Sequence, residues 1–176
     1  MKKIALLFIA VILVLSVSSC KKEESDTPDG MFYEENTAVD YKLYLPEGWI
    51  IDRNDGMVSA HVSQEDKTNV SVTAFELPRE FTTLTEYLDG EYKTRFQQNF
   101  TNMEIVEDFT ETELDGNDAR RIVFKAEVGG VSYQFMQILT LHRDGCIYIF
   151  TYTSTPDYFD VHKESIDKIV QEFTFN

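Results

Sequence analysis

The stretch Asp118–Ser154, DARRIVFKAEVGGVSYQFMQILTLHRDGCIYIFTYTS, decides the fold. Apolar residues alternate along it in three runs, which are Arg121–Val128, Val131–His142 and Cys146–Thr153. Because successive side chains of a strand point to opposite faces, each run predicts a β-strand. Gly129-Gly130 and Asp144-Gly145 separate the runs, and such pairs favour tight hairpin turns. We therefore expect consecutive antiparallel strands.

The third of these strands is apolar on both faces. Over Ile147–Phe150, apolar side chains fall on the odd and on the even positions. A strand with two apolar faces is normally covered on both sides. We therefore expect Cys146–Thr153 to lie at the centre of the sheet. The predicted fold class is α+β, with an antiparallel sheet covered by helices on both faces, an α/β/α sandwich.

Further strands and two helices are predicted around this centre. The strands lie within Ala38–Asp52, where Pro46-Glu47-Gly48 makes a turn, and at Met57–Val62, Asn69–Leu77 and Met103–Leu114. Thr83 and Glu86 form a capping-box pattern that opens a helix to about Asn99. Its apolar residues recur every four positions, at Leu84, Leu88, Tyr92, Phe96 and Phe100. A last helix begins near Pro156, and its inner face carries Phe159, His162, Ile166, Ile169, Val170 and Phe173.

The N-terminus has the pattern of a bacterial export signal. Lys2 and Lys3 precede the apolar run Ile4–Leu15, which is shorter than the roughly 20 residues of a membrane-spanning helix. Val17-Ser18-Ser19-Cys20 resembles a lipobox, in which the cysteine is acylated and becomes the mature N-terminus. We expect residues 1–19 to be a lipoprotein signal peptide, 20–37 a lipidated N-terminus and flexible tether, and 38–176 a single domain. The protein would be exported and held by lipid on Cys20 at the cell membrane or outer membrane, on the extracytoplasmic side.

Composition excludes several classes of protein. The 176 residues carry a formal charge of −15, and loss of residues 1–19, with Lys2 and Lys3, would leave −17. Nucleic-acid partners are therefore not expected, since phosphates are bound by Lys and Arg. Thirteen Phe and nine Tyr supply a core and argue against a disordered chain.

With Cys20 lipidated, Cys146 has no partner for an intrachain disulfide and is expected to be a buried apolar residue.

The segment Tyr41–Trp49, YKLYLPEGW, resembles the opening strand and turn of the PsbP-like or Mog1-like modules. In that family a short hairpin, a helix, a run of antiparallel strands and a C-terminal helix follow. The same order is predicted here over roughly residues 31–176. In bacteria these modules include many small lipoproteins, and they mostly act in assembly or binding. The resemblance therefore implies a non-catalytic module.

No catalytic constellation is expected, and the chain is predicted not to be an enzyme. His61, His142 and His162 lie on separate elements without metal-ligand spacing, and no nucleophile-elbow or phosphate-loop motif is present. No cofactor is predicted. Strand alternation places Glu107, Glu111 and Glu113 on one face, where they are weak candidates for a cation site. More often such residues form a solvated strand edge.

Two functions remain open from the sequence. The first is a membrane-anchored, exported lipoprotein with a non-catalytic binding or interaction module and a protein partner in the cell envelope. The alternative is a carrier of a small ligand or divalent cation, which would use a pocket beside the sheet or the acidic strand.

Overall fold

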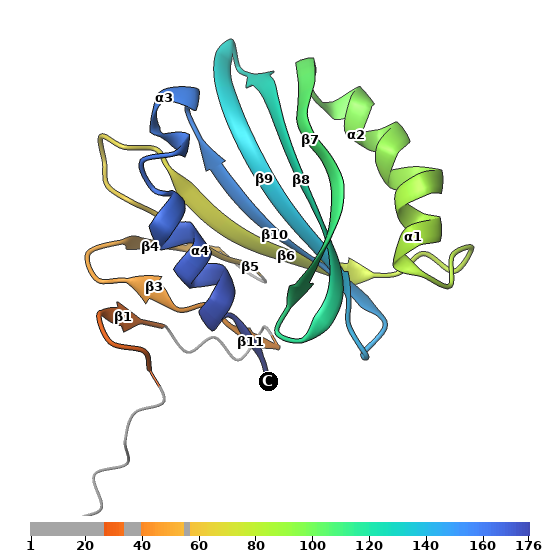
Figure 1. The fold of residues 1–176 in the computed structure, drawn as a ribbon, viewed down its shortest axis with the longest axis horizontal. Coiled ribbons are helices and arrows are strands. Elements are labelled where there is room, and N and C mark those ends of the chain that lie inside the picture. The colour runs from red at the N-terminus through yellow and green to blue at the C-terminus, as the bar shows by residue number, and fades with distance from the viewer. Residues whose placement is uncertain (1–26, 34–39, 55–56) are drawn as a thin grey trace, which may run out of the picture.

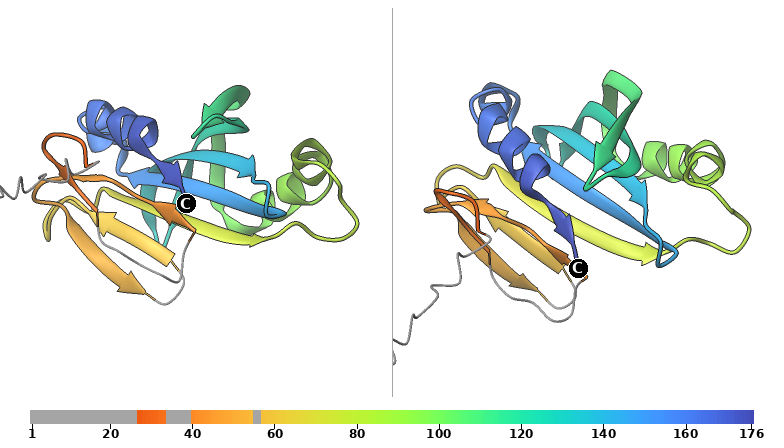
Figure 2. Two further views of the ribbon diagram at one scale, coloured as in Figure 1. Left: turned by 90° about the horizontal axis from the view of Figure 1, so that it is seen from below. Right: turned by 60° about the horizontal axis from the view of Figure 1, so that its bottom comes forward.

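Seven strands form one antiparallel sheet in the order β4-β5-β6-β10-β9-β8-β7 (Figure 1). The structure, a computed structural model, describes residues 27–33, 40–54 and 57–176. The strands of this sheet are β4 (Ile50–Asn54), β5 (Met57–His61), β6 (Asn69–Glu76), β7 (Thr101–Leu114), β8 (Asn117–Val128), β9 (Val131–Leu141) and β10 (Cys146–Ser154). Figure 2 shows how strongly β7–β9 curl relative to β4–β6.

The predicted run of three strands is confirmed. β8, β9 and β10 pair as consecutive antiparallel neighbours. Gly129 and Gly130 have φ values of +61° and +80° and join the paired residues Val128 and Val131. This two-residue turn needs positive φ at both positions, which glycine adopts without strain. β10 lies in the middle of the sheet, as its two apolar faces predict.

The first predicted helix is present but contains a wider turn. It consists of α1 (Leu84–Tyr87), the π-helix η1 (Leu88–Tyr92) and α2 (Lys93–Asn99) in direct succession. The Thr83 hydroxyl caps it by accepting a hydrogen bond from the Glu86 amide at 3.1 Å. The i→i+5 bonding of a π-helix widens the turn. A wider turn keeps apolar residues spaced four apart, such as Leu88 and Tyr92, on the same buried side.

The last helix is broken, so the prediction of one continuous helix is wrong. It is divided into α3 (Pro156–Phe159) and α4 (Lys163–Glu172). The Tyr152 hydroxyl donates to the Phe159 carbonyl at 2.7 Å and occupies the acceptor that a continued helix would bond to Lys163. Burial raises the pKa of Tyr152 to about 12, so this hydroxyl keeps its proton at neutral pH.

Two apolar clusters lie on opposite faces of the sheet. On β10, Tyr148 and Phe150 belong to one cluster, whereas Ile147 belongs to the other. The first cluster includes Ile166 and Ile169 of α4, and the second includes residues of α1 and η1. An α+β fold with a large antiparallel sheet is therefore confirmed.

Helices do not cover the whole of both faces. Phe75 on β6 is 36% exposed, and Ile105 and Val106 on β7 are 44% and 50% exposed. The complete helical cover expected for an α/β/α sandwich is therefore not seen. Figures 1 and 2 show α4 and the α1–α2 helix over separate parts of the curled sheet, so strand residues outside these parts stay exposed.

Short strands tie both ends of the described chain to the domain. β1 (Met31–Phe32) pairs with β3 (Leu45–Pro46), and β2 (Tyr41–Lys42) pairs with β11 (Thr174–Phe175). Met31 is buried in the first cluster, although it lies in the range 20–37 expected to be a tether. The folded part thus includes residues before Ala38. A strand of two residues shows no periodicity, so alternation could not predict it.

The predicted signal peptide and Cys20 lie outside the described residues. Within the described ranges, no helix has the length and apolar character needed to cross a membrane.

Candidate functional site

An open groove crosses one face of the sheet at the end where β5 stops and β6 begins. We call it the sheet groove. It has a volume of about 690 Å³, within the usual range for small-molecule sites. Its lining residues come from six strands of the sheet and the connection between β5 and β6, and they are Asp52, His61, Gln64, Lys67, Asn69, Val128, Tyr133, Phe135 and Thr153.

Strand register explains how these distant residues meet. His61 pairs with Asn69, Asn69 with Thr153, and Thr153 with Phe135. Directly paired residues point to the same face, so these four form one row across the sheet. Strands are about 4.8 Å apart, which makes the row about 14 Å long. It is polar at His61 and aromatic at Phe135.

Small polar side chains leave this part of the face open. Ser71 pairs with Thr151. These two residues lie two positions along their strands from Asn69 and Thr153, on the same face of the sheet. Farther along β10, the same face carries Ile149 and Ile147, which belong to the cluster under α1 and η1. Of the two threonines that follow on this face, Thr151 accepts a hydrogen bond from the Gln137 side-chain amide at 3.1 Å, and Thr153 lines the groove.

At the polar end, His61 and Asp52 form a pair. The His61 Nδ1 atom lies 3.1 Å from Asp52 Oδ2, and the two side chains are 17% and 45% exposed. This contact leaves His61 Nε2 without a hydrogen bond within the described part of the chain. The pair thus offers the groove a ring nitrogen and carboxylate oxygens.

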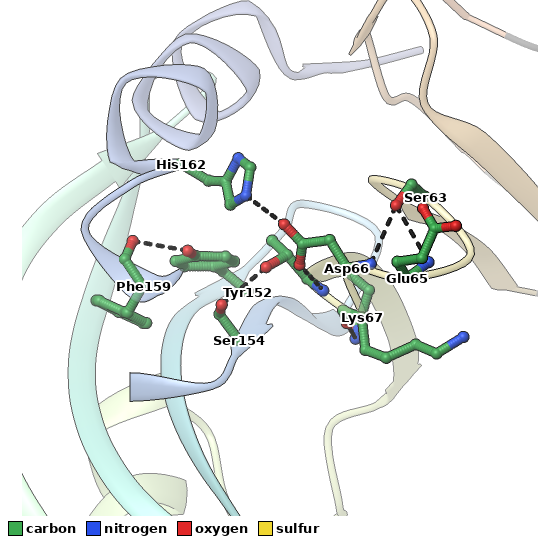
Figure 3. A network of polar contacts seen from close by, with 10 residues as sticks. Ser63, Glu65, Asp66, Lys67, Tyr152, Ser154, Phe159 and His162 are labelled. Carbon is green, nitrogen blue, oxygen red and sulfur yellow. Dashed lines mark hydrogen bonds and ion pairs between the residues drawn. The ribbon is translucent and has the colours of Figure 1, made fainter. Parts of the chain in front are cut away.

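The 62–68 loop, between β5 and β6, supplies Gln64 and Lys67 to the groove and is fixed from behind. Figure 3 shows Asp66 between its own loop and the start of α4. Asp66 Oδ2 lies 2.6 Å from His162 Nε2, and Oδ1 accepts from the Thr68 amide at 2.9 Å. The hydroxyls of Thr68 and Ser154, both fully buried, are 2.8 Å apart.

The charge state of Asp66 follows from these contacts. Burial acts to raise the pKa of this carboxyl, but the hydrogen bonds from Thr68 and the His162 contact outweigh it. The pKa of Asp66 is therefore below its ordinary value of 3.8, and the group is ionised at neutral pH. A charged acceptor strengthens the hydrogen bonds that fix the loop.

The acidic strand does not form the site that alternation predicted. Glu107 pairs with Val123 and Thr110 with Arg121, so β7 has an extra residue between them. This bulge moves Glu107 to the opposite face from Glu111 and Glu113. Glu107 lies 3.1 Å from Arg121, and Glu111 lies 3.3 Å from Arg120. Among the described residues, no three His, Cys, Asp or Glu side chains are grouped to hold a metal.

The remaining candidates lie apart from the groove. His142 stacks on Phe175 with 4.2 Å between ring centroids, and its Nδ1 atom is 3.5 Å from Asp144. Cys146 is partly buried beside the first cluster, and burial together with Asp144 raises its thiol pKa. A raised pKa disfavours the thiolate, so this cysteine has the inert character expected of it.

Sequence reasoning did not single out the groove residues, except for His61 as an isolated histidine. One signal was available. Thr151 and Thr153 follow Ile147 and Ile149 on one face of the central strand, and Ser71 and Thr73 occupy a face of Asn69–Leu77. Polar residues on one face of central strands indicate a part of the sheet that no helix covers.

Comparisons with known proteins place the fold. The model of the family described as PsbP-like protein matches residues 13–175. No curated protein sequence matches the chain. The structure of CyanoP, the cyanobacterial PsbP of Synechocystis sp. PCC 6803, is similar with a TM-score of 0.60 and 19% identity. That match covers 86% of this chain and 96% of CyanoP.

Two further solved structures share the fold. LpqN of Mycobacterium tuberculosis, involved in cell envelope biogenesis, matches with a TM-score of 0.58 and 13% identity, over 77% of this chain and 83% of LpqN. The Ran-binding protein Mog1p of Saccharomyces cerevisiae matches with a TM-score of 0.56 and 11% identity, over 82% and 95% of the two chains. At these identities the likeness concerns the fold alone.

Proposed function

The chain belongs to the PsbP-like protein family, and from this premise we propose that it is an exported lipoprotein with a non-catalytic binding module. Lipid on Cys20 would hold the domain at the extracytoplasmic side of a bacterial membrane. The lipobox-like segment Val17–Cys20 supports the anchor, and the fold shared with LpqN, which is involved in cell envelope biogenesis, supports the location.

The sheet groove is the observation that supports a binding role for this module. It combines an apolar end with polar side chains that are not used within the fold. The side chains of Gln64 and Lys67 and the Tyr133 hydroxyl make no hydrogen bond or ion pair in the described ranges. Polar groups of this kind, converging on a concave surface, are typical of a ligand site.

The same geometry argues against catalysis in the groove. A hydroxyl nucleophile must lie within hydrogen-bond reach of its base, at about 3 Å. Thr153 is the hydroxyl on the row of His61, but it is two strand spacings away, about 10 Å. We therefore propose a binding role for the His61–Asp52 pair.

The alternative function is a carrier, either of a small ligand or of a divalent cation. The groove favours the carrier of a small ligand. The divalent-cation form depended on Glu107, Glu111 and Glu113 acting together, and the bulge in β7 separates them. A protein partner in the envelope remains part of the proposal, since the same surface is open to a protruding side chain.

Recovery of bound material from crosslinked membranes tests the proposal. Val128→Glu places a charge in the groove, and Val106→Glu is a matched control, because the two valines are 48% and 50% exposed. Each protein is recovered by a tag, and its co-purifying proteins and solvent-extracted small molecules are identified by mass spectrometry. We expect at least one species to be depleted about tenfold by Val128→Glu and retained by Val106→Glu. Equal recovery from both variants would overturn the groove as the binding site.

A further inference from the structure

The charges that line the groove indicate which net charge its ligand carries. The lining contains one carboxylate, Asp52, and one ammonium, Lys67, so its formal charges balance. The remainder of the chain is strongly acidic, with a formal total of −15. Such a protein repels anions at long range. A cation would find the Asp52 carboxylate already held by His61 and would share the groove with Lys67. The balance favours a neutral ligand.

The backbone of the sheet excludes a peptide held in the usual way. Extended peptides are bound mainly through main-chain hydrogen bonds at a free strand edge. The lining strands β5, β6, β10, β9 and β8 are each paired on both sides, and β4, which contributes Asp52, lies at the edge of the sheet and not across the groove floor. The N–H and C=O groups of the strands paired on both sides are used within the sheet. A ligand in the groove must therefore be recognised by side chains.

These side chains suit a molecule with many hydroxyl groups. Asp52 accepts hydrogen bonds, Lys67 donates them and Gln64 does both. Asn69 offers its Oδ1 atom and one N–H, because its Nδ2 atom already donates to the Lys67 carbonyl at 2.9 Å. At the other end, the half-buried Tyr133 presents an aromatic ring, and the buried Phe135, 6.2 Å away between ring centroids, supports it from below. A sugar ring carries hydroxyls at its rim and C–H groups on its faces, so it matches both ends of the row.

From this arrangement we propose that the sheet groove binds a neutral oligosaccharide. The inference rests on the proposed function, since it assigns a ligand class to the same site. A sugar ring lies against Tyr133, and the hydroxyls of the next ring bond to Gln64, Asn69 and the His61–Asp52 pair.

Titration with defined sugars tests this assignment. The full-length protein is kept in lauryldimethylamine oxide, which has no sugar head group. Chitotriose, cellotriose and maltotriose are the probes, trigalacturonate is the charged comparison and trialanine the peptide comparison. Binding is followed by saturation-transfer-difference NMR and calorimetry. We expect saturable binding of at least one neutral trisaccharide and of neither comparison ligand.

Matched variants test whether the sugar binds in the sheet groove. Tyr133→Leu removes the aromatic platform and should weaken affinity at least about tenfold, whereas Tyr158→Leu, at an exposed tyrosine on α3, should leave it unchanged. Gln64→Ala, on an exposed loop residue, gives a second reading if Tyr133→Leu does not fold. Absence of binding by all three neutral sugars, or binding that both groove variants leave intact, would overturn the assignment.

The two proposals fail differently. If the sugars do not bind but Val128→Glu still depletes a species recovered from membranes, the ligand class is wrong and the groove remains a binding site. If Val128→Glu depletes nothing, the binding function itself is wrong.

Discussion

At the scale of single residues, Asp66 links the groove to the rest of the domain. Its carboxylate joins the 62–68 loop to His162, at the break between α3 and α4. The same loop presents Gln64 and Lys67 to the groove. Sequence patterns could not predict this contact, since 96 positions separate the two residues and neither belongs to a recognisable motif.

Asp66→Asn should destabilise the domain in a pH-dependent manner. Because folding lowers the pKa of Asp66, its charge stabilises the fold above the ordinary pKa of 3.8, and this contribution is lost as pH falls through the lowered value. Hydrogen bonds to charged groups predict a loss of about 1–2 kcal/mol at pH 5. Urea unfolding of both proteins measures the difference at pH 5 and at steps below 3.8. A difference that stays constant over these steps would contradict the role of the charge.

At the scale of elements, the helix from Leu84 to Asn99 shows a conflict between local propensity and packing. Gly90 costs helix stability, yet a Cβ atom at this position would lie 2.8 Å from the Phe81 ring. The glycine thus allows the Phe81 ring to pack against the π-helical segment. The sequence predicts the helix from its cap and its spacing of four, but not the ring that lies against it.

A double-mutant cycle tests this packing. Gly90→Ala should be more favourable by about 1–2 kcal/mol in a Phe81→Ala background than in the wild type, because the clash is then absent. Thermal or urea unfolding of the four proteins gives the coupling. Identical effects in both backgrounds would show that the contact has no energetic weight.

The edge strand β7 is the element in which strict alternation predicts the wrong face for a side chain. Met103–Leu114 was predicted correctly as a strand, but its faces were not, since bulges leave no trace in the pattern of residue types. The ion pairs of Glu107 and Glu111 lie at an exposed edge. They have the charged and bulged character that discourages pairing with another chain.

Glu107→Gln combined with Glu111→Gln should therefore have little effect. Exposed ion pairs each contribute up to about 1 kcal/mol, so a small loss of stability is expected. Calcium or manganese should not raise the melting temperature of either protein, as followed by circular dichroism. A saturable, metal-dependent rise that the double variant abolishes would restore the cation carrier.

At the scale of the whole molecule, the sequence predicts the long central strands of the sheet better than the short strands and the groove. Three long strands follow from two glycine turns, and the central place of β10 follows from its two apolar faces. β1 and β11, of two residues each, have no period to detect. The groove draws its lining from six strands and a loop, so it exists only once the register is fixed.

The proposed anchor also belongs to this scale. Cys20→Ser should move the protein from the membrane pellet to the soluble fraction, because each buried methylene of the acyl chains contributes about 0.8 kcal/mol. Fractionation with immunoblotting gives the partition, and the intact mass of the wild type reports the lipid. Equal partition of both proteins would contradict lipid anchoring at this residue.

The central claim, that the sheet groove is the binding site of this module, is tested most directly by photocrosslinking in living cells. A photoreactive phenylalanine is placed at Val128, on the groove, and in a second strain at Val106, on β7. We predict that illumination yields a discrete adduct, identified by mass spectrometry, from position 128 and none from position 106. The same adducts from both positions, or adducts from position 106 alone, would contradict the account.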